Sequence, residues 1–145
     1  MNKPIQLPMF KPETEWVPPT HLPDLKEHKE IAIDLETRDP NLLTMGSGSV
    51  RGDGEVIGIA VAVEGWSGYF PINHEGGGNM DRAVVLDWFE EVLHTEATKI
   101  FHNAMYDVSW IRSMGYTING GIIDTLIAAS LIDENRWGYS LNALG

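Results

Sequence analysis

The sequence is 145 residues long, the size of one ordinary globular domain with a single hydrophobic core. Ten basic residues stand against 21 acidic ones, and the formal net charge of −11 is the opposite of the basic surface typical of a self-sufficient nucleic-acid-binding protein. Cysteine is absent, which excludes a disulfide framework, a thiolate nucleophile and a cysteine-ligated zinc site. Any metal site must therefore use oxygen or nitrogen ligands.

The N-terminal segment, residues 1–29, carries most of the prolines and shows neither a helical nor a strand period. It is therefore predicted to be an extended arm that leads into a domain over residues 30–145. Its first ten residues lack the apolar stretch of a signal peptide, and no apolar run in the chain is long enough to span a bilayer. We expect a cytoplasmic protein with no membrane partner.

Three strands are predicted after this arm. From Glu30 onward, Ile31, Ile33 and Leu35 alternate with less apolar residues, which is the period-two pattern of a strand. Residues 38–54 are rich in Gly, Ser and Asp and predict a long connection with at most one turn of helix. Residues 56–63 form a nearly continuous run of β-formers, and residues 68–72 predict a third strand.

Helices and strands alternate in the remaining sequence. Asn79 is predicted to be the N-cap of a helix over residues 80–94. A strand over 99–102 then precedes a helix over 103–114, and a strand over 121–123 precedes a helix over 125–132. The order βββαβαβα predicts an α/β domain, in which a mixed sheet carries helices on its faces.

The first candidate site residues are Asp34 and Glu36, at the carboxyl end of the first predicted strand. Residues two apart on a strand share a face, so these two carboxylates project together and repel each other. A bound cation or a shared proton would offset that repulsion, and oxygen ligands of this kind suit Mg²⁺ or Mn²⁺. The alternative is a solvated strand end without function, and the Asp-x-Glu pattern alone does not separate the two.

The second candidate is Asp107, in the sequence Phe-His-Asn-Ala-Met-Tyr-Asp over residues 101–107. On a helix that begins at Asn103, Asp107 falls within the apolar stripe. Burial of an unpaired carboxylate is costly, so Asp107 should meet a metal ion, a basic partner or the mouth of a cleft. A buried aspartate satisfied by main-chain amides is the structural alternative. Tyr106 and Trp110 are the aromatic residues that could be exposed in the same cleft.

Together, the two motifs and their spacing resemble the DEDD superfamily of 3′-5′ exonucleases, whose fold is ribonuclease H-like. Within it, the chain is similar to the proofreading domain of phage-type family A DNA polymerases; if the chain is phage-encoded, the expected location is the host cytoplasm. The similar segments are Trp16-Val17-Pro18-Pro19, Ile31 to Pro40, Gly54 to Val63, and Phe70-Pro71-Ile72-Asn73-His74-Glu75 with the glycines that follow.

The resemblance implies roles for particular residues. Asp34, Glu36 and Asp107 would be catalytic and would bind two divalent cations, Mg²⁺ or Mn²⁺, on either side of the scissile phosphate. Thr37 and Asn103 would contact the terminal nucleotide. The expected substrate is the 3′ end of single-stranded DNA, which the enzyme would shorten by hydrolysis of phosphodiester bonds.

The family carries a fourth aspartate, in a Tyr-x-x-x-Asp or His-x-x-x-x-Asp motif on a later helix. After Asp107 this sequence has only Asp124, which is predicted to be a helix N-cap, and Asp133, predicted at an exposed helix end. We therefore expect an exonuclease domain that is incomplete at its C-terminus. It should be weak or inactive unless a polymerase module or partner chain supplies the missing motif.

Two other functions stay open at this point. One is a non-catalytic structural or interaction domain of a replication protein that retains the exonuclease fold. The other is an exoribonuclease of the same superfamily that trims RNA.

Overall fold

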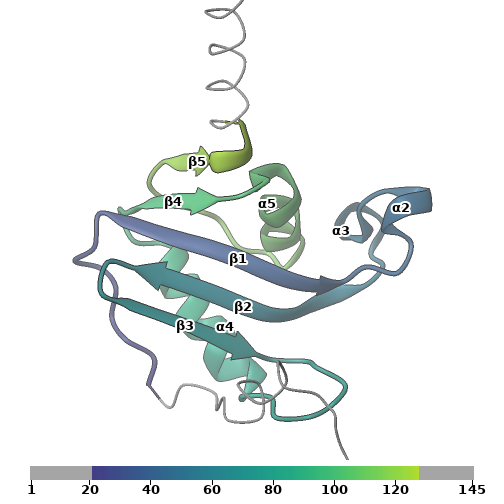
Figure 1. The fold of residues 1–145 in the computed structure, drawn as a ribbon, viewed down its shortest axis with the longest axis horizontal. Coiled ribbons are helices and arrows are strands. Elements are labelled where there is room, and N and C mark those ends of the chain that lie inside the picture. The colour runs from purple at the N-terminus through teal and green to yellow at the C-terminus, as the bar shows by residue number, and fades with distance from the viewer. Residues whose placement is uncertain (1–20, 128–145) are drawn as a thin grey trace, which may run out of the picture.

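The computed structural model describes residues 21–127, which form a five-stranded mixed sheet with helices (Figure 1). The strands are β1 (Glu30–Arg38), β2 (Glu55–Val63), β3 (Trp66–Pro71), β4 (Thr98–Phe101) and β5 (Ile122–Asp124), in the spatial order β3-β2-β1-β4-β5. β2 runs antiparallel to both β1 and β3, whereas β4 runs parallel to β1 and β5. This arrangement confirms the mixed α/β sheet that was predicted as ribonuclease H-like.

The alternating pattern of β1 divides the sheet into a buried face and an open face. Ile31, Ile33 and Leu35 are 0%, 3% and 7% exposed, whereas Asp34 and Glu36 point to the other side and are exposed. Side chains along a strand alternate between its two faces, so the pattern that stabilises the core also presents both carboxylates together.

Two helices supply the rest of the core. α4 (Arg82–Leu93) buries Val85, Phe89 and Val92, and in Figure 1 it lies behind the first three strands. α5 (Ala104–Ser113) adds Trp110 and Ile111 to the same buried cluster. Within the part of the chain that the structure describes, the face of the sheet with Asp34 and Glu36 carries no helix.

The predicted start of α4 is wrong. Its N-cap is Asp81, whose side chain accepts a hydrogen bond from the Val84 N–H at 3.2 Å. Asn79 instead closes the preceding turn, because its side chain bonds both main-chain groups of His74, at 2.7 and 2.9 Å. The third strand also begins two residues earlier than predicted, at Trp66, since Gly65 adopts a left-handed φ of 87° and makes the turn from β2 tight.

The connection between β1 and β2 contains two short helices, α2 (Leu42–Met45) and α3 (Gly48–Arg51), where at most one turn was predicted.

The described end of the N-terminal arm packs on α4: Leu25 is buried, and the Trp88 indole donates to the Pro23 carbonyl at 2.7 Å. Residues 1–20, the rest of the helix predicted from 125 and Asp133 lie outside the described residues. No helix within 21–127 is long and apolar enough to cross a membrane.

Candidate functional site

The candidate site lies where the carboxyl ends of β1 and β4 meet the first turn of α5 (Figure 1). The parallel pairing of β1 and β4 brings these ends to one edge of the sheet. α5 begins directly after β4, so its first turn places Asp107 next to the end of β1.

Asp107 is a buried carboxyl group that the protein only half satisfies. It is 4% exposed and is hydrogen-bonded to the main chain of Leu35, while its Oδ2 has no hydrogen-bond partner. Burial, together with the negative charges of Asp34 and Asp124, raises the pKa of Asp107 to about 7, and the Leu35 bond only partly opposes this. The predicted burial is confirmed, and main-chain hydrogen bonding accounts for one of the two oxygens.

Glu36 is held by groups on and after β3. The Tyr69 hydroxyl donates to Glu36 Oε1 at 2.6 Å, and His74 Nε2 lies 2.6 Å from the same hydroxyl and 3.7 Å from Oε1. Burial, the Glu36 carboxylate and the more distant Asp34 raise the pKa of Tyr69 above its usual range, so its hydroxyl stays protonated and donates.

The sequence by itself did not indicate a role for Tyr69 or His74. Tyr69 lies on β3 and His74 just after it. Both approach Glu36 of β1 only because β2 pairs with β1 and β3. The one sequence signal that could have located this contact is Gly58, a glycine inside a strand of β-formers.

The three predicted metal ligands are only partly brought together. Asp34 lies close enough to Asp107 to raise its pKa, whereas Glu36 is turned toward Tyr69. In the side-chain arrangement of residues 21–127, no group of three or more His, Asp or Glu residues is close enough together to hold a metal ion. The donor chemistry nevertheless fits a hard divalent cation, because all three groups are carboxylates and a cation would satisfy the unpartnered Asp107 Oδ2.

Thr37 and Asn103, the predicted substrate contacts, lie at the carboxyl end of β1 and directly before α5. A β-bulge separates Glu36 from Thr37, because Glu36 pairs with Gly58 whereas Thr37 pairs with Val56. Asn103 precedes α5 with a left-handed φ of 76°, is exposed, and makes no capping bond with its side chain.

The first turn of α5 is instead capped by Asp124. Its Oδ1 and Oδ2 accept hydrogen bonds from the main-chain N–H groups of Asn103 and Ala104, each at 2.9 Å. Desolvation works to raise the pKa of Asp124, but the bonds from Ala104, Asn103 and Leu126 outweigh it and lower the pKa. The Leu126 bond, at 2.9 Å, confirms that Asp124 also caps the segment that follows it.

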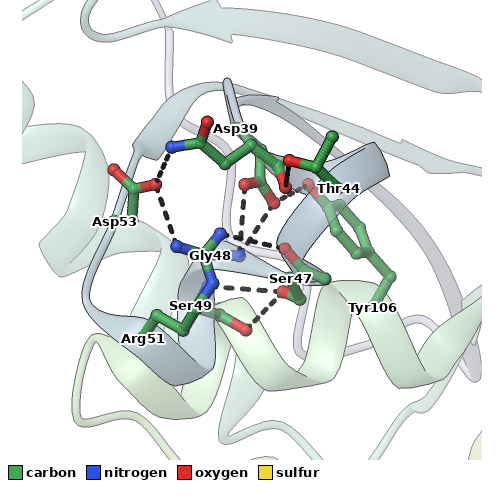
Figure 2. A network of polar contacts seen from close by, with 10 residues as sticks. Asp39, Thr44, Ser47, Gly48, Ser49, Arg51, Asp53 and Tyr106 are labelled. Carbon is green, nitrogen blue, oxygen red and sulfur yellow. Dashed lines mark hydrogen bonds and ion pairs between the residues drawn. The ribbon is translucent and has the colours of Figure 1, made fainter.

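A polar network fastens the connection between β1 and β2 to α5 (Figure 2). Thr37 Oγ1 lies 2.7 Å from the Tyr106 hydroxyl, which donates to Asp39 Oδ2 at 2.9 Å. The Asp39 carboxylate in turn accepts from the Gly48 N–H, with its oxygens at 3.1 and 3.0 Å from the nitrogen. The half-buried Tyr106 therefore connects β1 and the β1–β2 connection to α5, whereas Trp110 is 4% exposed and belongs to the core.

A groove of about 670 Å³ runs over the open face of the sheet and borders Asp34, Tyr69 and His102. Its lining combines small residues, Ala32, Ala60, Ala62, Ser67 and Gly68, with larger apolar ones such as Ile100 and Phe101. His102, which directly follows β4, also lines the groove and is hydrogen-bonded to Thr125 at 2.9 Å, so the groove reaches the carboxyl end of β4.

Comparison with known proteins decides the family. Residues 20–144 match the 3′-5′ exonuclease domain of the DNA polymerase A class. The chain belongs to this 3′-5′ exonuclease family. The match confirms the predicted resemblance, and the family consists of hydrolases that act on phosphodiester bonds and generally use divalent metal ions.

The relatives of this exonuclease domain are parts of much longer polymerases. The DNA-directed DNA polymerase of Pseudomonas phage M6 is 37% identical over 153 residues, which covers 97% of this chain and 22% of the phage protein. DNA polymerase I of Borreliella burgdorferi is 28% identical over 112 residues, which covers 77% of this chain and 11% of that protein. Among solved structures, Brucella melitensis NrnC aligns with a TM-score of 0.49 and 22% identity, over 74% of this chain and 46% of that chain.

Proposed function

We propose that this exonuclease domain removes nucleotides from the 3′ end of single-stranded DNA by metal-dependent hydrolysis, as the proofreading part of a larger polymerase. The observation that carries the proposal is the Asp107 carboxyl group, buried beside Asp34 with one oxygen unpartnered. Two carboxylates so placed repel each other, and a divalent cation bound between them would replace that repulsion with electrostatic attraction.

Asp34, Glu36 and Asp107 are the residues that would hold two cations, Mg²⁺ or Mn²⁺. When bound, such ions deprotonate a water molecule for attack and stabilise the charge on the scissile phosphate and the leaving oxygen. Asp34 and Asp107 already lie within electrostatic reach of each other, and Glu36 has one oxygen outside its contact with Tyr69.

Thr37 and Asn103 would orient the terminal nucleotide. The bulge at Thr37 locally disrupts the β1–β2 ladder at the carboxyl end of β1, and Asn103 exposes its side chain at the start of α5. A chain with a net charge of −11 gains little from general attraction to DNA, so we expect it to hold only a few nucleotides, delivered by a polymerase module.

Titration of Mn²⁺ into the 145-residue chain tests the metal site directly. Wild type should show saturable binding by calorimetry, and Asp34→Asn, Glu36→Gln and Asp107→Asn should each weaken it at least about tenfold. Asp87→Asn is the matched control, because it removes an exposed carboxylate from α4, on the other side of the sheet. Absence of Mn²⁺ binding to wild type would contradict the proposal and favour a non-catalytic domain.

A cleavage assay tests the substrate. With Mn²⁺ and a 5′-labelled single-stranded DNA, we expect slow shortening from the 3′ end, and the double variant Asp34→Ala/Glu36→Ala should abolish it. The same assay on an RNA strand of equal sequence separates the two substrates, since faster shortening of RNA would contradict proofreading and favour an exoribonuclease.

A further inference from the structure

Tyr69 reaches Glu36 across an entire strand. In the sheet register Tyr69 of β3 pairs with Ala60 of β2, while Glu36 of β1 pairs with Gly58 of β2. The Tyr69 side chain therefore extends diagonally over Gly58 to place its hydroxyl 2.6 Å from Glu36 Oε1. Strands next to each other are about 4.8 Å apart, so only a long side chain over an unobstructed strand can make this contact.

Gly58 provides the space for that contact. A Cβ at this position would lie 1.8 Å from the Tyr69 hydroxyl oxygen and 2.4 Å from the adjacent ring carbon. The backbone of Gly58 does not adopt a left-handed φ, so its conformation does not require glycine. Glycine inside a strand weakens the strand, and here the close approach of the Tyr69 ring accounts for it.

His74 contacts the same Tyr69 hydroxyl, and its Nε2 also lies 3.7 Å from Glu36 Oε1. The hydroxyl has one proton, which it donates to Glu36, so His74 Nε2, 2.6 Å away, is the donor to the Tyr69 oxygen. The two rings meet edge to face with centroids 5.9 Å apart, and both main-chain groups of His74 are hydrogen-bonded by Asn79. The result is a directed series of hydrogen bonds from His74 through Tyr69 to Glu36.

We propose that Tyr69, supported by His74, is the positioning residue that fixes the Glu36 carboxylate for cation binding through its other oxygen, Oε2. This inference rests on the proposed function, because it concerns the same metal site. The Glu36 side chain is 52% exposed, so without this contact it would sample several rotamers, and Oε2 makes no hydrogen bond to the residues that the structure describes. Metal-binding carboxylates are commonly oriented by such hydrogen bonds, whose loss weakens metal affinity about 10- to 100-fold.

The first test compares Tyr69→Phe with wild type by calorimetric titration of Mn²⁺ into the full 145-residue chain. The dissociation constant should rise about 10- to 100-fold, while the thermal unfolding midpoint changes no more than in Tyr116→Phe. Tyr116→Phe is the matched control, because it also removes one phenolic hydroxyl but takes no part in the series that ends at Glu36. A purely structural role of Tyr69 would lower the unfolding midpoint and leave the affinity for Mn²⁺ unchanged.

The second test displaces the hydroxyl without removing it. Gly58→Ala should weaken Mn²⁺ binding to a similar extent, because its methyl group occupies the position of the Tyr69 hydroxyl. In a chain that already carries Tyr69→Ala, Gly58→Ala should have no further effect on the dissociation constant, since no ring remains to be displaced. Gly58→Ala keeps the Tyr69 side chain, so it tests the positioning role by itself even if Tyr69→Phe fails to fold.

Each outcome separates this inference from the proposed function. If wild type binds Mn²⁺ and Tyr69→Phe binds equally well, the positioning role is wrong and the metal site stands. If Tyr69→Phe binds more tightly, the hydroxyl holds Glu36 away from the cation, which also overturns the inference. If wild type binds no Mn²⁺, both proposals fail together.

Discussion

Asp124 and Ala104 are joined by a hydrogen bond that connects the end of β5 to the start of α5. Asp124 Oδ2 accepts from the Ala104 main-chain N–H at 2.9 Å, although the two residues are 20 positions apart in sequence. The first turn of a helix has unsatisfied N–H groups and a partial positive charge, so a carboxylate from a neighbouring strand stabilises it twice over. The turn fixed in this way carries Asp107.

Replacement of Asp124 by alanine should loosen the first turn of α5. We expect the amide hydrogens of Asn103 and Ala104 to exchange about five- to tenfold faster, because both lose their acceptor. Asp81→Ala is the matched control, since it removes the N-cap of α4 and should accelerate exchange at Val84 only. Equal acceleration at both helices in both variants would contradict a local role for Asp124.

Replacement of Asp107 by asparagine should make the protein more stable at alkaline pH in the absence of metal. The folded pKa of about 7 lies above the ordinary value of 3.8, so the folded state holds this proton more tightly than the unfolded state. Ionisation of Asp107 therefore lowers the free energy of unfolding progressively as the pH rises from about 4 to about 7. Above pH 7 this loss is complete.

In urea unfolding with EDTA, Asp107→Asn should exceed wild type in the free energy of unfolding by about 1–3 kcal/mol at pH 8. At pH 4 the same comparison should show a much smaller gain. A difference that does not vary with pH would show that Asp107 does not titrate between these limits.

Replacement of Tyr106 by phenylalanine should detach the connection between β1 and β2 from α5. The variant loses the hydroxyl that bridges Thr37 and Asp39, and the free energy of unfolding should fall by about 1–2 kcal/mol. Trypsin should also cleave after Arg51 more rapidly. Ser113→Ala serves as the control, because it removes a hydroxyl hydrogen bond on the same helix, about two turns away from Tyr106. Unchanged cleavage at Arg51 would show that the connection is held by other contacts.

Replacement of Gly48 by alanine should displace α3. A Cβ at Gly48 would lie 1.9 Å from the Asp53 carbonyl oxygen and 2.8 Å from Asp39 Oδ1, and neither group can move freely. We expect a loss of about 1–3 kcal/mol in the free energy of unfolding. Gly76→Ala should change it by less than about 0.5 kcal/mol, because a Cβ there meets nothing within 4 Å. Equal effects of the two substitutions would place Gly48 in open space, contrary to the structure.

Local sequence patterns predicted most of the elements correctly. The alternation of Ile31, Ile33 and Leu35 is a property of adjacent residues, and it identified β1, its buried face and the shared exposure of Asp34 and Glu36. The helix ends were less predictable. Several residues near α4 and α5 could cap them, and the choice of Asp81 over Asn79, and of Asp124 over Asn103, depended on what each side chain meets in the folded chain.

The sequence by itself therefore determined the order of the elements, the absence of any cysteine chemistry, the acidic charge and the family resemblance. The tertiary structure decided which groups meet: Asp34 with Asp107 through the parallel pairing of β1 and β4, and Glu36 with Tyr69 across Gly58. The physical reason is one of range. Hydrophobic periodicity acts between neighbouring residues, whereas the partner of a carboxylate is set by strand register and by the space left free in a neighbouring strand.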